Sequence, residues 1–353
     1  MIRYAIRRFL FSIPTLFAIS LIVFSILKLA PGDPTSNLPL TIPAEQREAI
    51  REAMGFNEPF FQQYLNWMKL MLWNEPLHLI NETFGVCLSP GGACEELDRM
   101  ISWQSRSPAL DRIYERVPQT LWVLGLGLLF GVLIAVPIGT MQAYRQYSLF
   151  DNAGTVVTML GFSVPVFVIG PLLIWLFAVP HRSFLGIDVD WGGWLPSSYQ
   201  TTHDVDFTSL SSIWIQIKQL ILPVSVLTLF NAAQFGRFTR ASVLENLNES
   251  FVRTARSKGL AEGTVMNRHV LRNSLIPVVT LLALSIPGIF GGAIITESIF
   301  SINGLGEQLL LSIRQNDLFM VQSLVFIFAF LTVLFNIIAD ILYGLLDPRI
   351  RYD

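Results

Sequence analysis

Residues 251–277 read FVRTARSKGLAEGTVMNRHVLRNSLIP, the most charged long stretch in a largely apolar chain. Its positive charge comes from Arg253, Arg256, Lys258, Arg268, His269 and Arg272, against the single acid Glu262. Apolar runs of roughly twenty residues flank it, the length that a bilayer-crossing helix needs. A basic loop between two such spans belongs on the cytoplasmic side of the membrane.

The order of residues within this stretch is more informative than its charge. Residues 252–258 contain no helix breaker, and Gly259 can take the left-handed conformation that ends a helix. A second helical run, 261–274, leads into the next apolar span. The sequence therefore predicts a helix, a glycine turn and a second helix along the membrane surface, a shape suited to docking into a partner.

The composition indicates a polytopic membrane protein. Of 353 residues, 52% are hydrophobic and only 14% are charged, against about 25% charged in soluble domains. The chain has no G-x-x-x-x-G-K-[ST] phosphate loop and no H-E-x-x-H zinc pair. We therefore expect no ATP hydrolysis by this chain alone, no catalytic residue and no metal site. The net charge of −2 gives no indication of nucleic-acid binding.

The hydrophobic pattern predicts an all-α protein with six transmembrane helices. A basic start followed by the apolar run 9–30 is also typical of a cleaved signal peptide, but signal h-regions are about 7–15 residues long. We interpret the run as an uncleaved first span with a cytoplasmic N-terminus. The remaining spans are expected at about 118–143, 152–179, 213–239, 275–299 and 319–346. This topology places both termini in the cytoplasm, which agrees with the arginine and lysine bias of the loops.

The expected organisation has four parts. Residues 1–30 form the N-terminus and first transmembrane helix, and residues 31–116 form a long, acidic external segment with amphipathic helices. Residues 117–346 form a five-helix core that includes the cytoplasmic loop 243–274. Residues 347–353 form a cytoplasmic tail.

The external segment holds an aromatic run and both cysteines. Aromatic and large apolar residues recur at helical spacing over 60–73. The pattern fits a helix lying in the membrane interface and equally a helix packed on other spans. Cys87 and Cys94 flank a proline-glycine turn and are expected to form a disulfide outside the cytoplasm. Two free thiols are the alternative.

Several residues inside the spans are candidates for a gate or path. Ser163 and Pro165 in the third span and Pro287 and Gly288 in the fifth permit bends where a cavity is lined. Ordinary helix kinking is the alternative. Asp340 lies in the inner half of the sixth span. It is either a functional carboxylate or the ion-pair partner of an arginine in the tail. Residues 300–318, with a 304–306 glycine turn, dip toward a bound receptor or the cavity, or form a plain surface loop.

The basic loop resembles the EAA loop of ABC-transporter permeases, whose general pattern is E-A-A, three residues, G, nine residues and I-x-L-P. Arg253-Thr254-Ala255 occupies the triplet without its glutamate, and Gly259 occupies the glycine position. The distal residues 269–272 lack the proline. The wording RTARSKGL and RHVLRNSLIPVVT instead resembles the B-type membrane subunit of dipeptide/oligopeptide (peptide/nickel) importers. The same resemblance extends to 30–34 (APGDP), 115–121 (ERVPQTL), 163–165 (SVP), 304–306 (GLG) and 347–352 (DPRIRY).

This resemblance implies a type I ABC importer permease fold in the bacterial inner membrane. It implies that a short coupling helix docks into a groove of an ATPase subunit; the residues concerned are Arg253, Thr254, Ala255, Arg256, Ser257, Lys258, Gly259 and Leu260. The expected partners are a second permease subunit, two ABC ATPase subunits and an external substrate-binding protein. The second permease subunit is expected to be a paralogue, and a second copy of this chain is the alternative. No cofactor is expected in this chain, because ATP and Mg bind the ATPase subunits.

Other functions remain open at this point. An ion-coupled carrier needs carboxylates or histidines near the bilayer midplane, where only Asp340 is a candidate. An intramembrane enzyme needs a convergent nucleophile and base or a metal set, and the spans contain neither pattern. Peptides are the expected substrate, and a nickel chelate, glutathione or a sugar is the alternative.

Overall fold

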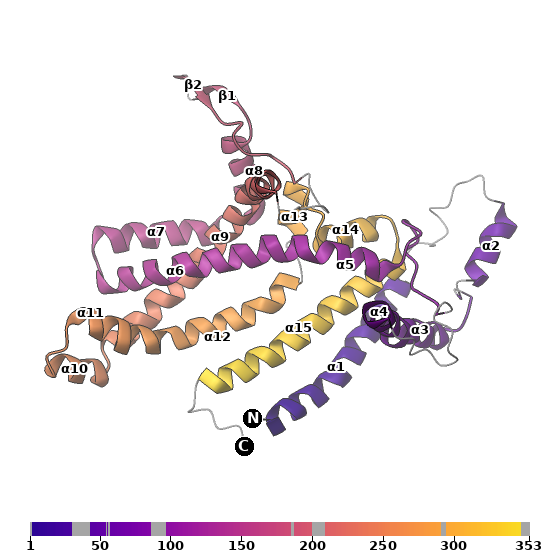
Figure 1. Ribbon diagram of the computed structural model, residues 1–353, viewed down its shortest axis with the longest axis horizontal. Coiled ribbons are helices and arrows are strands. Elements are labelled where there is room, and N and C mark those ends of the chain that lie inside the picture. The colour runs from indigo at the N-terminus through magenta and orange to yellow at the C-terminus, as the bar shows by residue number, and fades with distance from the viewer. Residues whose placement is uncertain are drawn as a thin grey trace. The chain divides into compact units, whose positions relative to one another are not determined.

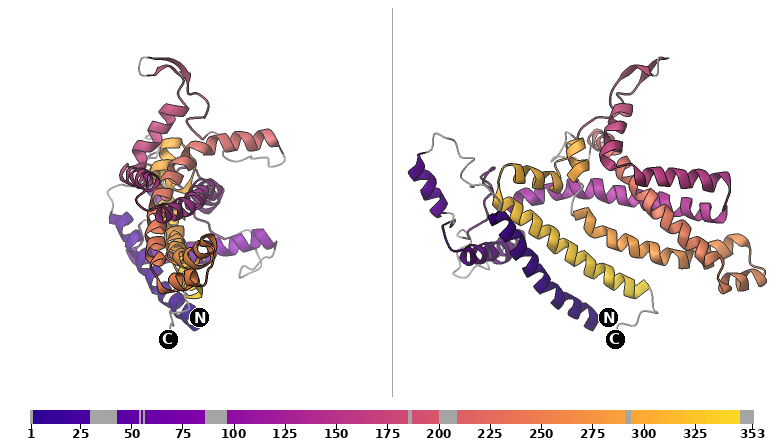
Figure 2. Two further views of the ribbon diagram at one scale, coloured as in Figure 1. Left: turned by 90° about the vertical axis from the view of Figure 1, so that its left-hand side faces the viewer. Right: turned by 180° about the vertical axis from the view of Figure 1, so that it is seen from behind.

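The computed structural model describes residues 2–29, 43–53, 55, 57–85, 97–184, 187–199, 209–290 and 294–346. These ranges are almost entirely helical (Figures 1 and 2). They divide into two compact units, each described by itself below. Unit 1 comprises Met1–Phe9, Val117–Glu307 and Leu331–Asp353, and unit 2 comprises Leu10–Arg116 and Gln308–Phe330.

Five helical stretches are long and apolar enough to cross a membrane: Ile6–Leu29, Ala109–Tyr144, Leu210–Leu247, Glu262–Ile286 and Leu318–Ile341. Two further helices, α7 (Leu149–Ser163) and α8 (Val166–Phe177), pass the same test together and make a sixth span if they are counted as one. The expected all-α, six-span class is confirmed.

The long helices correspond closely to the expected spans. Those with a single label are α1 (Ile2–Leu29), α9 (Leu210–Leu247) and α15 (Leu318–Leu346). The second span combines α5 (Ala109–Thr120), the π-helical turn η3 (Leu121–Gly125) and α6 (Leu126–Tyr144). The fifth combines α11 (Glu262–Thr264), the π-helical η4 (Val265–Val270) and α12 (Leu271–Phe290). This span therefore begins before Leu275, the first residue expected in it.

The third expected span is not a straight helix. α7 and α8 meet at an angle of 106°. Pro165 ends the connection as the extended N-cap of α8, and Val164 before it is also extended, with ψ 122°. A proline disfavours the helical conformation in the residue before it, and this restriction explains the break. The sequence predicted that a bend was permitted here, but not its size.

Unit 1 is built around the packing of α6 on α9 (Figure 1). A Cβ added to Gly127 would lie 2.6 Å from Leu227 Cβ, one on Gly131 2.5 Å from Asn231 Cβ, and one on Gly139 2.6 Å from the Gly236 carbonyl oxygen. Only glycine permits such an approach. Gly127, Gly131 and Gly139 therefore form the face of α6 that packs on α9.

Short elements complete unit 1. They are the antiparallel hairpin of β1 (His181–Phe184) and β2 (Ile187–Trp191), the helix α10 (Ser250–Ser257) and the helix α13 (Ile294–Phe300). Near the chain ends, Arg8 Nε lies 2.8 Å from Asp340 Oδ2. Asp340 therefore pairs with an arginine of the N-terminal segment; the expected tail partner lies outside the described residues.

Unit 2 contains the described part of the external segment. Its remaining helices are α2 (Ala44–Ala53), α3 (Phe60–Lys69), the π-helical η2 (Leu70–Asn74), α4 (Glu75–Phe84) and α14 (Leu305–Arg314), whose first turn belongs to unit 1. The Trp67 ring lies edge-on to Phe326 of α15, with ring centroids 5.6 Å apart, and also contacts Phe24 of α1.

Packing on other helices is confirmed for one face of the aromatic run, and the membrane-interface interpretation stays a prediction for the other face. Tyr64, Trp67, Met68 and Met71 are buried in unit 2. On the other face, Phe61 is 71% exposed and Trp73 58%. Buried and exposed apolar side chains on one helix fit an element that packs on protein with one face and meets lipid with the other.

Candidate functional site

The basic stretch folds as its sequence predicts, as a short helix that ends in a glycine turn. The backbone N–H of Val252 donates to the carbonyl of Glu249, the N-cap residue. At the other end Gly259 has φ +74°. Its N–H donates to the carbonyl of Arg256 (2.9 Å), and the N–H of Leu260 donates to Ala255 (3.4 Å). These two bonds form a Schellman motif.

Helix α10 has one buried face and one exposed face. Val252 and Ala255 are 0% and 4% exposed and belong to an apolar cluster with Val243 of α9, Ala143 of α6 and Val265 of η4. Helix α10 therefore packs directly on the end of α6 at Ala143 and on the end of α9 at Val243. The residues from Arg253 to Leu260, apart from Ala255, are exposed.

The exposed face of α10 and the turn after it is positively charged. Glu262 neutralises one arginine, since Arg256 Nη2 lies 2.6 Å from Glu262 Oε1. This hydrogen bond with Glu262 raises the pKa of Arg256. Arg253, Lys258 and Arg268 are exposed as well. The surface suits a partner groove with acidic or hydrogen-bond-accepting groups.

A buried ion pair joins the cytoplasmic end of α9 to the first turn of α7. Arg240 donates from Nε to Asp151 Oδ1 at 2.7 Å and from Nη2 to Oδ2 at 2.9 Å, a two-pronged contact. The Tyr147 N–H also donates to Asp151. The sequence analysis singled out neither partner, and charge complementarity between two helix ends 89 residues apart was the only available signal.

The four gate or path candidates lie at two places in unit 1. Ser163 and Pro165 are exposed at the bend between α7 and α8. Pro287 and Gly288 lie in α12, and Gly288 is exposed with open space around its Cα. Both α7 and α12 pack on α9. The structure does not bring the two pairs into one cluster among its described contacts.

A buried carboxylate organises the turn at 304–306. Glu297 of α13 is fully buried and accepts hydrogen bonds from the Thr120 hydroxyl (2.9 Å) and the Glu307 N–H (2.8 Å). The Leu305 N–H donates to the same Thr120 hydroxyl at 2.8 Å. Leu305 is 1% exposed and Ile302 0%. This segment is therefore anchored in the core of unit 1, and the plain surface-loop alternative is wrong for it.

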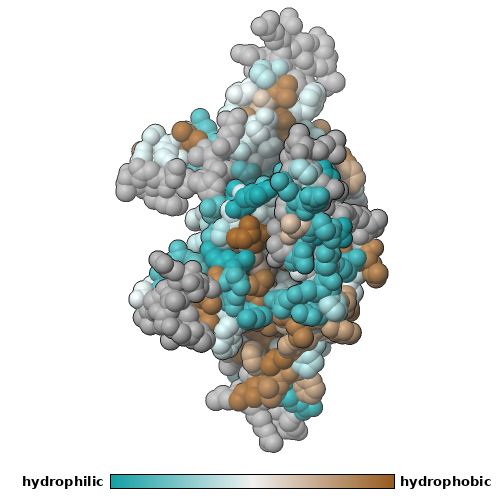
Figure 3. All heavy atoms as spheres, turned by 90° about the vertical axis from the view of Figure 1, so that its right-hand side faces the viewer, coloured by the Kyte–Doolittle hydropathy of each residue, from teal (hydrophilic) through white to brown (hydrophobic). Residues whose placement is uncertain are grey.

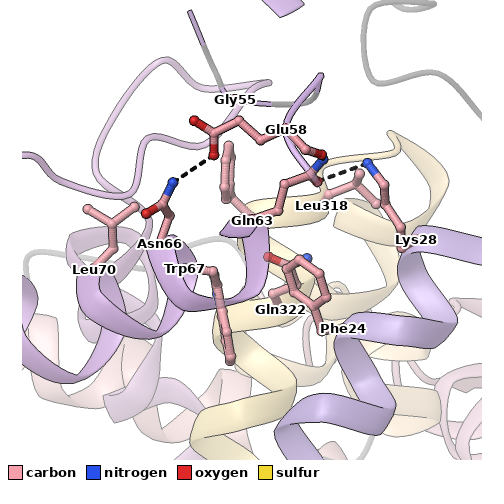
Figure 4. A pocket seen from close by; sticks show the side chains of 11 residues that line it. Phe24, Lys28, Gly55, Glu58, Gln63, Asn66, Trp67, Leu70, Leu318 and Gln322 are labelled. Atoms are coloured by element: carbon pink, nitrogen blue, oxygen red, sulfur yellow. Dashed lines mark hydrogen bonds between the residues drawn. The ribbon is translucent and has the colours of Figure 1, made fainter. Parts of the chain in front are cut away.

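Unit 2 contains two adjoining cavities. One, about 80 Å³, lies between the ends of α1, α3 and α15, where Lys28 donates to Gln63 and Asn66 donates to Glu58 (Figure 4). The other, about 480 Å³, has polar walls that include Glu52, Asp98 and Arg99. In the face drawn in Figure 3, hydrophilic side chains surround a small hydrophobic patch near the centre. The smaller cavity has the volume of a few waters, too little for a peptide.

Two further expectations, the disulfide and the lack of a metal site, stay predictions. Cys87 and Cys94 lie outside the described residues, so their disulfide stays a prediction. Within the described ranges, no three histidine, cysteine or acidic side chains are grouped as metal ligands.

Comparison with known proteins gives matches along the whole chain. Residues 128–352 match the family model of the binding-protein-dependent transport system inner membrane component, and residues 1–124 match the model of its N-terminal region. The oligopeptide transport system permease protein of Bacillus subtilis is 35% identical over 353 residues, all of both chains. The dipeptide transport system permease protein of Alkalihalophilus pseudofirmus is 32% identical, and the glutathione transport system permease protein of Escherichia coli K12 31%, again over all of both chains.

Proposed function

The chain belongs to the family of binding-protein-dependent transport system inner membrane components, and from that premise we propose that it forms the translocation path for peptides. It is a multi-pass inner membrane protein and the permease subunit of an ABC importer. The family works with an ATPase and a substrate-binding protein. The observation that carries the coupling part of the proposal is α10, with one face buried on α6 and α9 and the other exposed and basic.

The peptide substrate is supported by the relatives. One is named an oligopeptide permease and another a dipeptide permease. The glutathione permease transports a molecule that is itself a small peptide. We therefore place peptides before the nickel chelates and sugars that the resemblance also permits.

The proposed assembly has two permease subunits, this chain and a paralogue, with two ATPase subunits that bind ATP and Mg. The external binding protein delivers the peptide. Residues 253–260 dock into one ATPase, and the ATPases move α10 when they close on ATP. The buried Val252 and Ala255 transmit that movement to α6 and α9. The binding of ATP by the ATPase subunits thus shifts the equilibrium between two arrangements of the permease helices.

The ends of the helices move together in this proposal because they are tied. Arg240 and Asp151 hold α9 to α7, and α7 leads into the bend at Ser163 and Pro165. A displacement that begins at α10 therefore reaches the gate candidates through packed helices and one ion pair. Pro287 and Gly288, on α12, are the other proposed gate residues.

Co-purification tests the class of assembly. The tagged chain is expressed with its chromosomal neighbours, extracted in mild detergent and analysed for bound proteins. Two ATPase subunits and a second permease are expected. A chain that purifies alone, and that transports alone, would contradict the proposal.

Gly259→Pro tests the coupling itself. Proline fixes φ near −65°, whereas Gly259 has φ +74° and a bonded N–H. The variant is expected to insert and assemble normally but to lose stimulation of the ATPases by the loaded binding protein. Ala261→Pro is the control, because Ala261 is exposed and already has φ −60°. Equal stimulation of the two variants would count against the coupling role of this turn.

A further inference from the structure

One arginine of α9 has no counter-charge among the described residues. Arg237 is exposed, and its guanidinium carbon lies 5.0 Å from the centre of the Phe162 ring. Phe162 in turn stacks on Phe230, with centroids 6.2 Å apart and planes 14° from parallel. The described carboxylates that pair with arginines belong to Asp340, Glu48, Glu75, Asp111, Asp151 and Glu262, each with an arginine other than Arg237.

The packing of α7 on α9 fixes the direction of the Arg237 side chain. Gly161 faces Ala233, and Gly236 faces Thr158, so the two helices run antiparallel. Arg237 therefore lies near the level of residue 157, and Phe162 lies more than one helical turn farther from the cytoplasmic end of α7. The guanidinium reaches away from that end, toward the bend in the middle of the α7–α8 pair.

This direction is the wrong one for an arginine that faces lipid. Such a side chain extends toward the nearer headgroups, because a charge deep in the hydrocarbon is costly. The Cα–Cβ bond of a helical residue leans toward the helix N-terminus, which sets Arg237 off toward the bend, and the face of Phe162 holds the guanidinium there. An exposed guanidinium that reaches away from the cytoplasmic end of α7, with no counter-charge among the residues that the structure describes, fits a water-filled path.

The neighbouring residues are the gate candidates of this chain. Ser163 follows Phe162 directly, and Pro165 caps α8 on the other side of the bend. All four side chains at this place, Phe162, Ser163, Pro165 and Arg237, are exposed. The exposed bend between α7 and α8 thus has the positive charge of Arg237, the hydroxyl of Ser163 and the aromatic ring of Phe162 close together.

We propose that Arg237, held by Phe162 and Phe230, binds the carboxylate of a peptide during its passage through this subunit. The inference rests on the proposed function and deepens it, since every linear peptide with a free C-terminus carries that carboxylate. A guanidinium binds a carboxylate through two parallel N–H donors, and the stacked rings hold the guanidinium plane in place for it.

The test uses the whole transporter, reconstituted in phosphatidylcholine vesicles with its ATPases, second permease and binding protein. Two labelled peptides differ only in having a free or an amidated C-terminus, and are chosen so that the binding protein takes up both. Arg237→Gln is expected to slow transport of the free acid roughly tenfold or more, in line with the loss of a hydrogen-bonded charge pair. It should leave the amide nearly unchanged, and Arg237→Lys should retain part of the free-acid rate.

Lys218→Gln is the matched control. Lys218 lies 5.4 Å from the Trp214 ring on the same helix, nearer its other end, and the variant should transport both peptides normally. An Arg237→Gln variant with the wild-type rate, or with equal losses for acid and amide, would overturn the inference. A loss that appears only with anionic lipids would assign the guanidinium to a lipid phosphate and also overturn it. Failure of the wild-type transporter to move either peptide would instead refute the proposed function.

Discussion

Arg240 of α9 donates two hydrogen bonds to Asp151 of α7, of 2.7 and 2.9 Å, and Asp151 is 1% exposed. The pair joins α9, which leads into the basic stretch 251–277, to α7, which ends at the bend. Since α10 packs on the end of α9 through Val252 and Val243, the contact lies between the proposed docking surface and the proposed gate.

Asp151→Asn should destabilise the protein strongly. The change leaves a guanidinium without its carboxylate, and breaking a buried pair costs about 3 kcal/mol or more. The midpoint of thermal unfolding in detergent measures the effect. Glu262→Gln breaks the exposed pair with Arg256 and should hardly move the midpoint, because exposed pairs contribute little. Equal effects of the two variants would show that the buried pair has no special importance.

Gly139→Ala should loosen the packing of α6 on α9. The new Cβ would lie 2.6 Å from the backbone oxygen of Gly236. A backbone atom cannot move out of the way by changing rotamer, as a side chain can. Overpacking of this kind costs about 1–3 kcal/mol. Gly125→Ala is the control, because a Cβ there meets nothing within 4 Å. An unfolding midpoint that stays at the wild-type value in Gly139→Ala would contradict the close helix approach.

Glu297→Ala should release the 304–306 turn. It leaves the Thr120 hydroxyl and the Glu307 N–H without their acceptor, at about 1–3 kcal/mol for each unsatisfied donor. Limited trypsin digestion at Arg314, in the helix after the turn, should become faster. Thr120→Val should have a similar effect and should not add fully to the first, because the two residues share one network. Fully additive effects of the two variants would contradict the view that Glu297 and Thr120 belong to one hydrogen-bond network.

Cys87 and Cys94 should be linked. Mass spectrometry of a digest made without reductant is expected to contain a peptide pair joined through the two residues. Both cysteines recovered in alkylated form would refute the bond.

Much of the structure of the basic stretch 251–277 could be predicted from sequence because its determinants are local. The absence of breakers before Gly259, and the left-handed φ that glycine allows, define the end of α10 within a few residues. The packing face of α6 also has a local signal in the sequence, because Gly127 and Gly131 are four residues apart and lie on one side of the helix.

Other features depend on contacts between distant segments. Nothing near Asp340 in the sequence indicates Arg8, which lies at the opposite end of the chain and pairs with it. In the sequence, nothing distinguishes Glu297 from any other acidic residue near a span. Only the fold brings Thr120 and the backbone of residues 305–307 close to it. The 106° bend had a visible cause in Pro165, but its angle depends on how α8 packs on α9 and α13.

The central claim is that the exposed face of α10 docks on an ATPase, and photocross-linking tests it most directly. A photoreactive residue replaces Thr254, which is exposed on α10, in the purified transporter. The same group at Trp194, 53% exposed beyond α8, is the control. The account predicts that position 254 cross-links to an ATPase subunit and that position 194 does not. An absence of ATPase adducts at 254, or equal adducts at both positions, would contradict it.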